Sequence, residues 1–379
     1  MPDPLPRPAN RWDRLVALAF VAALTIPGIA LLAGVRPPEL ENRAEAAFPT
    51  LSLESLIEPS TYKAIDDYVA RSLPARDVAV GAYATLDYEV LGGSTDPDVV
   101  VGVGDWLFFV GELRPTCAVT AGDLLAQWDA VTAAAERAGI RVRFGIAPDK
   151  HAIYPERLRP EPRMPVACTD AMRAEVRAGM AARPDSTVDF WTAVMAERER
   201  SKTPIYFNQD SHWTPTGAMP AIKALVESLE PGVWDDDEIT IDGTSRFPME
   251  LARLMGKPRD GIVPRYVVRP TVKVKQTAIA TTVELGNARD LMVFVTSGSK
   301  RVVPGTTLVV YDSFFNINRQ RMAPWFERTV WVHAGDLRDH PELVEALPAF
   351  DTIVLERVER GAYDTNLERL FRPVLDASR

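Results

Sequence analysis

The sequence contains little cysteine, little histidine and no excess of basic charge, and each scarcity excludes a class of protein. Two cysteines in 379 residues are too few for a disulfide scaffold or a cysteine-rich zinc site. A formal net charge of −9 argues against a nucleic-acid partner, because phosphate binding requires a basic surface. No glycine-rich phosphate loop is present; Gly102 and Gly104 lack the later glycine of a dinucleotide site. We therefore expect neither a cofactor nor a bound metal.

One long apolar run is present near the N-terminus. Residues 15–35 carry no charge and are long enough to cross a bilayer, which takes about 20 residues. Basic residues precede this run at Arg7, Arg11 and Arg14, so the positive-inside rule places residues 1–14 in the cytoplasm and the remaining chain outside. We expect an uncleaved signal anchor and a single-pass membrane protein; a cleaved signal peptide is the alternative. Residues 36–50, which follow this run, are predicted to form a linker.

The two cysteines, Cys117 and Cys168, lie in the part of the chain expected outside the cytoplasm, where disulfides persist. They are 51 residues apart. A disulfide between them and a pair of unbonded thiols are both compatible with the sequence.

In the rest of the chain, residues 51–379, some apolar segments have the spacing of helices and others are the short continuous runs of buried strands. Helical spacing predicts helices over 54–90, 120–138, 169–183, 192–200 and 216–229, and buried β runs occur at 99–110, 141–147, 306–311, 330–332 and 352–355. A short helix is expected at 343–347. Alternating strands and helices predict an α/β domain with a mainly parallel sheet and helices on both faces. Residues 235–305 are the least regular and predict a β-rich insertion.

Asp210 and His212 form an Asp-x-His pair in the loop before the helix at 216–229. In an extended loop the carboxylate can bind one ring nitrogen and leave the other free to accept a proton. Three alternatives stay open: two metal ligands without a strong third, a structural pair, or an aspartate that caps a turn.

Ser313 follows the apolar run 307–311 by two residues, at the carboxyl end of a predicted strand, where α/β folds place their active sites. A serine hydroxyl becomes a nucleophile when a histidine takes its proton and a carboxylate orients that histidine. Asp210, His212 and Ser313 are therefore a candidate triad. The alternative is that Asp312 and Ser313 cap the turn after the strand.

Several segments, taken in order, resemble the alginate O-acetyltransferase AlgX/AlgJ family, a branch of the SGNH hydrolase-like superfamily. The resemblance extends from about residue 41 to 361 and rests on short motifs: Glu41-Asn42-Arg43 with Phe48-Pro49, Gly104-Asp105-Trp106-Leu107-Phe108-Phe109, Pro148-Asp149-Lys150, Ile153-Tyr154-Pro155-Glu156, Asp210-Ser211-His212-Trp213-Thr214, Leu251-Ala252-Arg253-Leu254-Met255-Gly256, Asp312-Ser313-Phe314 and Glu356-Arg357-Val358-Glu359-Arg360. The Asp-x-His-Trp box is the most specific of them.

The resemblance implies an SGNH hydrolase-like, flavodoxin-like fold and transfer of acetyl groups to an exopolysaccharide or cell-envelope glycan. It implies Ser313 as nucleophile, His212 as base and Asp210 as the residue that orients it. It also implies a multi-spanning membrane acyltransferase as acetyl donor. Lys150, Tyr154 and Trp213 are candidates for substrate contact, with strand-end packing as the alternative for the first two.

Two other functions fit the same residues. An esterase that removes acetyl groups would use the same triad, because the outcome depends on whether water or a sugar hydroxyl is better placed. A membrane-anchored assembly or binding protein would leave the triad unused. Glu356 and Arg360 are expected to form a buried structural pair.

Overall fold

The computed structural model describes residues 11–35, 48–52, 54–72, 76–113, 120–159, 167–279, 291–337 and 346–364, with residues 340, 343, 367 and 371. Within them the chain forms two compact units, residues 1–95 and 96–379. The helices predicted over 54–90 lie in the first of these units. Cys117 and the Cys168 side chain fall outside the described residues, and so does the possible disulfide.

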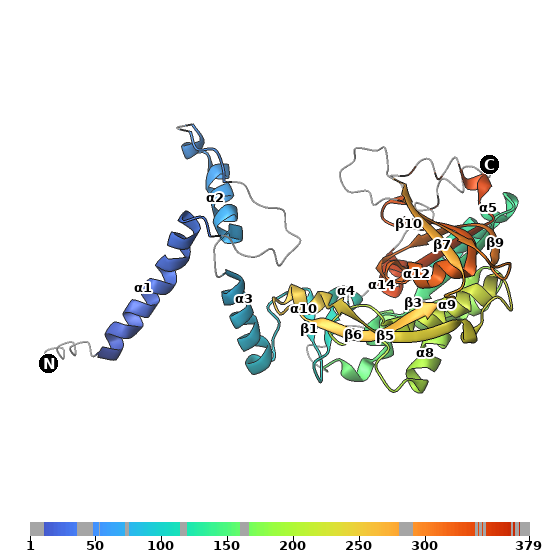
Figure 1. Cartoon of the computed structure of the whole chain (residues 1–379), viewed down its shortest axis with the longest axis horizontal. Coiled ribbons are helices and arrows are strands. Elements are labelled where there is room, and N and C mark those ends of the chain that lie inside the picture. Colours follow the sequence, from blue (N-terminus) through green and yellow to red (C-terminus); the bar gives the residue numbers. More distant parts are fainter. Residues whose placement is uncertain are drawn as a thin grey trace. The chain divides into compact units, whose positions relative to one another are not determined.

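The first unit is helical (Figure 1). It contains α1 (Arg11–Leu32), α2 (Pro59–Ser72), α3 (Arg76–Thr85) and a π-helical turn, η2 (Leu86–Leu91). Helix α1 is long and apolar enough to cross a membrane, and no part of its most apolar stretch is buried. A signal sequence has the same properties, so α1 is either a signal anchor or a signal peptide.

The second unit contains a seven-stranded sheet in the order β4-β3-β11-β9-β10-β8-β7. The sheet strands are β3 (Arg141–Ala147), β4 (Thr187–Val188), β7 (Lys273–Ile279), β8 (Leu291–Ser297), β9 (Val303–Tyr311), β10 (Phe326–His333) and β11 (Thr352–Val358). The five strands from β4 to β10 pair in parallel, while β8 and β7 extend the sheet antiparallel. The predicted α/β fold with a mainly parallel sheet is confirmed.

Helices cover both faces of this sheet, as predicted (Figure 1). One face packs against α5 (Ala121–Arg137) and α7 (Ala167–Ala181), and the other against α8 (Phe190–Arg200) and α9 (Pro215–Leu229). Strand β9 explains why two cores form: Leu308 and Val310 join the first, and Val309 joins the second. A strand buried on both faces reads as a continuous apolar run, which is what the sequence shows there.

Two helix starts follow directly from local sequence. Thr120 and Asp123 form a capping box at the start of α5, and the Thr214 side chain accepts a hydrogen bond from Gly217 N at the start of α9. Pro215 occupies the first helical position, where the missing N–H costs nothing. The loop that carries Asp210 and His212 therefore ends at a fixed point.

The β-rich segment 235–305 has two parts. Strands β5 (Ile239–Pro248) and β6 (Asp260–Val268) form a separate antiparallel ribbon, with α10 (Glu250–Leu254) between them. Strands β7 and β8 instead join the main sheet at its edge. The remaining elements of this unit are a hairpin of β1 (Val99–Val101) and β2 (Leu107–Phe109), and the short helices α4 (Val110–Leu113), α6 (Lys150–Ile153), α11 (Ser313–Asn316), α12 (Arg319–Met322) and α14 (Glu359–Asp364).

Candidate active site

Asp210 and His212 lie in direct contact. Asp210 Oδ1 is 2.7 Å from His212 Nδ1 and also accepts a hydrogen bond from the backbone N–H of His212 at 2.9 Å. Burial alone would raise the pKa of Asp210, but the hydrogen bonds from His212 and from the Glu250 N–H lower it. The carboxylate therefore stays ionised and holds one ring nitrogen of His212.

The other ring nitrogen, Nε2, is buried and has no hydrogen-bond partner among the residues that the structure describes. The ring itself packs against Phe314, with 5.0 Å between the ring centroids. Because Asp210 occupies Nδ1, Nε2 is the nitrogen that can accept a proton.

Ser313 is the first residue of α11, directly after β9, and is partly buried. Asp312 is the N-cap of this helix and accepts hydrogen bonds from Phe314 N at 3.0 Å and Val358 N at 2.7 Å. Within the described part of the chain, neither the hydroxyl nor the backbone N–H of Ser313 has a hydrogen-bond partner. The capping role that we set against catalysis thus belongs to Asp312, and Ser313 retains both groups.

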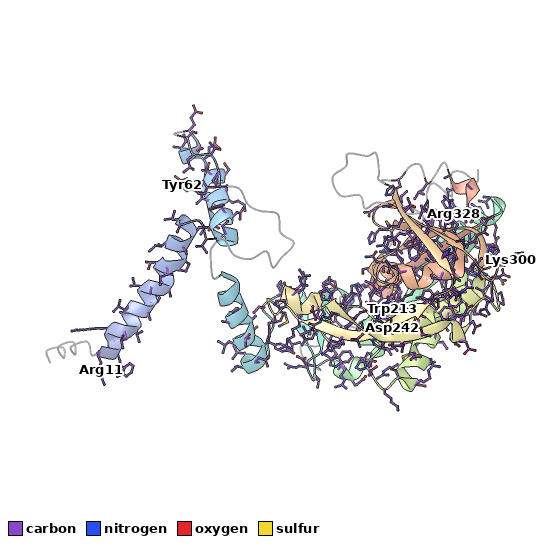
Figure 2. All side chains as sticks on the ribbon, in the orientation of Figure 1. Arg11, Tyr62, Trp213, Asp242, Lys300 and Arg328 are labelled. Atoms are coloured by element: carbon purple, nitrogen blue, oxygen red, sulfur yellow. The ribbon has the colours of Figure 1, made fainter. Side chains whose placement is uncertain are left out.

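Trp213 connects the two segments. Its indole Nε1 donates a hydrogen bond to the carbonyl oxygen of Phe314 at 3.0 Å, and its ring packs edge-on against the Phe314 ring at 5.2 Å. Trp213 is fully buried and lies inside the second unit, where Figure 2 labels it. The residue after His212 is thereby bonded to the residue after Ser313, which brings the Asp-x-His loop to the turn that carries the serine.

Lys150 binds the same loop through its side chain. Its side chain is fully buried, and Nζ donates to the carbonyl oxygens of Asp210 at 2.6 Å, Phe207 at 3.3 Å and Leu107. Burial lowers the pKa of Lys150 to about 8. Lys150 thus ties the β1–β2 hairpin to the loop that carries Asp210.

The other residues predicted to contact substrate are also buried. Trp213 is 0% exposed and Tyr154 is 8% exposed; the Tyr154 hydroxyl accepts a hydrogen bond from Ile205 N at 3.0 Å. The contacts of Lys150, Tyr154 and Trp213 within the described residues are with the protein itself. Their direct contact with substrate stays a prediction.

Glu250 is the residue that sequence reasoning missed. It is the first residue of α10, and its Oε2 accepts a hydrogen bond from Ser211 Oγ at 3.1 Å and lies 3.8 Å from His212 Nδ1. Asp210, His212 and Glu250 each place one ligand atom within 4.8 Å of the others. Glu250 is thus the candidate third metal ligand that the sequence did not reveal. The 2.7 Å between Asp210 Oδ1 and His212 Nδ1 is a hydrogen-bond distance, shorter than the roughly 3.3 Å that separates two ligand atoms each about 2.0–2.2 Å from a tetrahedral zinc ion.

A second carboxyl group lies beneath the serine turn. Glu356 is fully buried in β11, and its Oε2 accepts a hydrogen bond from Asp312 N at 3.2 Å. Burial, and then the charge of Asp312, raises the pKa of Glu356 well above its ordinary value. The expected pair with Arg360 is wrong, because Arg360 bonds to Asp149 on the neighbouring strand end.

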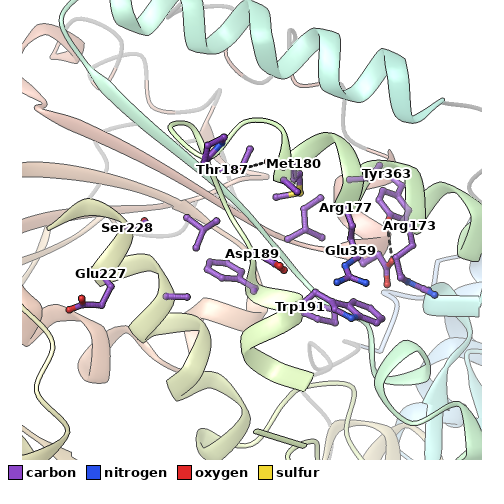
Figure 3. Close-up of a pocket in the computed structure, with 18 residues that line it drawn as sticks. Arg173, Arg177, Met180, Thr187, Asp189, Trp191, Glu227, Ser228, Glu359 and Tyr363 are labelled. Atoms are coloured by element: carbon purple, nitrogen blue, oxygen red, sulfur yellow. Dashed lines mark hydrogen bonds and ion pairs between the residues drawn. The ribbon is translucent and has the colours of Figure 1, made fainter. Parts of the chain in front are cut away.

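A cavity of about 480 Å³ lies beside the ends of β3 and β4 (Figure 3). Apolar side chains form most of its wall, and its polar rim includes Glu359, which accepts hydrogen bonds from Tyr363 at 2.8 Å and from Arg173. The Arg177 guanidinium stacks 4.7 Å above the ring of Trp191. None of Asp210, His212 and Ser313 lines this cavity.

Comparison with known proteins defines the class first. Residues 99–275 match the family model described as "SGNH hydrolase-like domain, acetyltransferase AlgX". The matched region runs from β1 into β7 and includes Asp210 and His212, while Ser313 lies beyond it. This part of the chain is therefore similar to SGNH hydrolase-like acetyltransferase domains.

The curated relatives that match the chain agree with this similarity. The chain is 23% identical over 191 residues to the probable alginate O-acetylase AlgJ of Azotobacter vinelandii, covering 50% of this chain and 48% of that protein. It is 26% identical over 183 residues to the AlgJ of Pseudomonas putida, covering 46% of this chain and 45% of that protein. The predicted resemblance to the AlgX/AlgJ alginate O-acetyltransferase family is confirmed. The chain spans about half the length of these curated relatives.

The solved structures to which the chain is similar include the O-acetyltransferase domain of Pseudomonas putida AlgJ, with a TM-score of 0.47 and 18% identity over 73% of this chain and 99% of that one. Bacillus cereus PatB1 with a sulfonyl adduct has a TM-score of 0.48 and 13% identity over 71% of this chain and 99% of that one.

Proposed function

We propose that this protein is an O-acetyltransferase that carries acetyl groups on Ser313 and transfers them to hydroxyls of an exopolysaccharide or cell-envelope glycan. The observation that carries the proposal is the contact between Asp210 and His212, which Trp213 holds beside the serine turn and in which Nε2 of His212 has no partner among the described residues. The relatives named alginate O-acetylases support the choice of an acetyl group and a polysaccharide.

The first half-reaction forms the acyl-enzyme. His212 Nε2 takes the proton of the Ser313 hydroxyl as Oγ attacks the acetyl carbonyl of the donor, and the leaving group departs with that proton. The ionised Asp210 stabilises the imidazolium that forms. The unbonded backbone N–H of Ser313 is available to bind the developing oxyanion.

The second half-reaction regenerates the serine. His212 Nε2 takes the proton of a sugar hydroxyl as its oxygen attacks the acetyl-serine carbonyl. Ser313 Oγ then leaves and recovers the proton from His212. The product is an acetylated sugar, and water in place of the sugar would make the same site an esterase.

Helix α1 supports a place for this chemistry outside the cytoplasm, with the domain tethered to or exported across the membrane. Free acetyl-CoA is a cytoplasmic donor, so an exterior transferase requires a partner that exports acetyl. We propose a multi-spanning membrane acyltransferase as this partner.

The test is acyl-enzyme formation. The full chain in detergent is treated with an activated acetyl ester, and Ser313 is examined by intact mass and peptide mapping. We expect one acetyl group on Ser313, none in Ser313→Ala, and acylation slowed at least about 10³-fold in His212→Ala, as for other serine acyltransfer sites.

An unlabelled but folded wild-type protein would contradict the proposal and favour a binding protein. A labelled protein that releases acetate and never acetylates an added glycan would favour the esterase.

A further inference from the structure

The cavity of about 480 Å³ lies at the same edge of the sheet as the serine turn, although the candidate triad does not line it. Ile146 and Pro148 border it at the carboxyl end of β3, Val188 at the end of β4, and Glu359 directly after β11. Open α/β sheets bind their ligands outside the carboxyl ends of their strands, so this cavity occupies a ligand-binding position of the fold. We call it the apolar cavity.

The wall of the apolar cavity is made mainly of hydrocarbon side chains. Val176 and Met180 of α7, Val188 of β4, Phe190 of α8 and Ala224 of α9 line it. The first four are at most 8% exposed. The volume lies in the range of about 300–1,000 Å³ that is usual for small-molecule sites. The body of a ligand that fits this cavity is therefore apolar.

Most polar side chains of the cavity already have partners within the protein. Arg173 bonds to the Glu359 carboxylate, and the Tyr363 hydroxyl donates to the same carboxylate at 2.8 Å (Figure 3). Four further polar side chains of the wall are hydrogen-bonded internally: Thr187, Asp189, Glu227 and Ser228. A sugar would bring hydroxyl groups that this wall leaves without partners, so the cavity is not suited to a glycan.

Two hydrogen-bond donors at the rim differ from the rest, because neither has a hydrogen-bond or ion-pair partner among the described residues. They are the guanidinium of Arg177, which stacks 4.7 Å from the centre of the Trp191 ring, and the indole N–H of Trp191 itself. Figure 3 shows the two side chains next to each other. Arg177 is exposed and Trp191 is half-buried, so an acid group bound there stays at the mouth of the cavity. A guanidinium beside a second N–H donor suits the two oxygens of one carboxylate.

We propose that the apolar cavity binds a straight-chain carboxylic acid, with its carboxylate at Arg177 and Trp191 and its hydrocarbon chain among the side chains of α7, α8 and α9. The free guanidinium selects an anion, and the wall selects an apolar body. Membranes are a source of such molecules, and α1 brings this chain to a membrane either as an anchor or as a signal sequence. The site goes beyond acetyl transfer and does not depend on it.

The experiment is photo-crosslinking of the full chain in nanodiscs. The probe is decanoic acid with a diazirine near its terminal carbon, and the labelled residues are mapped by mass spectrometry. Unlabelled decanoate and uncharged decanol compete with the probe. Arg177→Gln is compared with Arg328→Gln, a matched control at an exposed arginine of β10. Because parent and variants share one membrane composition, partition of each competitor into lipid cancels in the comparison.

We expect label on Val176, Met180 or Phe190 in the parent protein. The decanoate concentration that halves labelling should rise about 5- to 30-fold in Arg177→Gln, because a charged hydrogen bond at a hydrated rim is lost. It should stay within about twofold in Arg328→Gln. Decanol, which carries no charge, should compete equally in all three proteins. Arg177→Lys, which keeps the charge without the paired geometry, should recover part of the affinity.

A second pair of variants tests the hydrocarbon wall. Ala224→Phe adds a ring to the wall from α9, and Ala196→Phe adds the same ring at an exposed position of α8 outside the cavity. Label in the cavity should be lost in the first variant and kept in the second, with melting temperatures showing that both are folded. Arg177→Gln tests the proposal by itself if Ala224→Phe does not fold.

Equal competition by decanoate in the parent and in Arg177→Gln would overturn the carboxylate site. Label confined to α1, or label in the cavity that a folded Ala224→Phe protein retains, would overturn the assignment of the hydrocarbon chain to this cavity. None of these outcomes bears on acetylation of Ser313, which the crosslinking experiment does not require.

Discussion

At the scale of single residues, the contact between Asp210 and His212 could be predicted from the sequence, but the direction of the Lys150 side chain that binds their loop could not. Two residues apart in an extended loop, Asp210 and His212 face the same side, and the contact at 2.7 Å follows from that spacing. Lys150 follows a predicted strand end, which fixes its place on the sheet but not the direction of its side chain. The structure turns it inward to four backbone carbonyls rather than toward the surface.

Glu356 yields a pH prediction. Its pKa is raised in the folded protein, so the folded state keeps a proton that the unfolded state releases above about pH 4.5. The stability that Glu356 contributes is present below that pH and is lost as pH rises toward the folded pKa, by up to about 1.4 kcal/mol per pH unit. Glu356→Gln removes this loss. The melting temperature of Glu356→Gln, relative to that of wild type, should therefore rise as the pH increases from 5 to 8.

Differential scanning fluorimetry at several pH values checks this prediction. Glu136→Gln, on the exposed side of α5, serves as the control and should stay parallel to wild type. A constant difference between Glu356→Gln and wild type across the range would mean that Glu356 is ionised in the folded protein.

At the scale of elements, the strands and helices around the site were predictable because their apolar periods are long and regular. Strand β3 was predicted at its observed ends, and β9 and β11 were predicted over most of their length. The pairing of strands in residues 235–305 could not be predicted, because an alternating apolar and polar pattern indicates a strand but does not specify which strand pairs with it. For this reason the segment appeared as one insertion, although β7 and β8 belong to the main sheet.

The insertion also explains why Glu250 escaped sequence reasoning. It reaches the loop that carries His212 from a helix 38 residues further along the chain, between the two strands of the ribbon. No local pattern encodes a contact of that separation. Asp210, His212 and Glu250 could be a metal site or a hydrogen-bonded network, and these alternatives differ in their response to chelation.

We expect chelation to leave the chemistry intact. Asp210 and His212 are at hydrogen-bond distance, and a hydrogen-bonded imidazole needs no metal to accept the serine proton. Acetylation of Ser313 after dialysis against EDTA should stay within about twofold of the untreated rate, whereas removal of a catalytic metal would abolish acetylation. The measurement is the labelling rate by mass spectrometry. Activity lost with EDTA and restored by zinc would contradict this prediction.

At the scale of the whole molecule, the division at residues 95 and 96 separates the helical N-terminal unit from the sheet domain. The sheet, both cores and the candidate triad lie in residues 96–379. Composition and periodicity did not locate this boundary, because α2 and α3 are amphipathic like any domain helix.

The structure predicts that residues 96–379 fold without the preceding segment. Compared with residues 51–379, this fragment should melt within about 4 °C, which corresponds to roughly 1 kcal/mol for a domain of this size. It should also form the acetyl-serine at a similar rate. Thermal unfolding and labelling of both fragments check the prediction; an aggregated or unfolded shorter fragment would show that α2 and α3 complete the core.

The indole of Trp213 has a consequence for how this protein can change over evolution. His212 and Ser313 are separated by about a hundred residues, and the β5–β6 ribbon is inserted between them. Because one hydrogen bond from Trp213 to Phe314 fixes the two segments to each other, their spacing does not depend on the length of the chain that connects them. The ribbon strands are therefore free to exchange their surface for a new acceptor, while α10, whose Glu250 N–H binds Asp210, and the reacting groups keep their places.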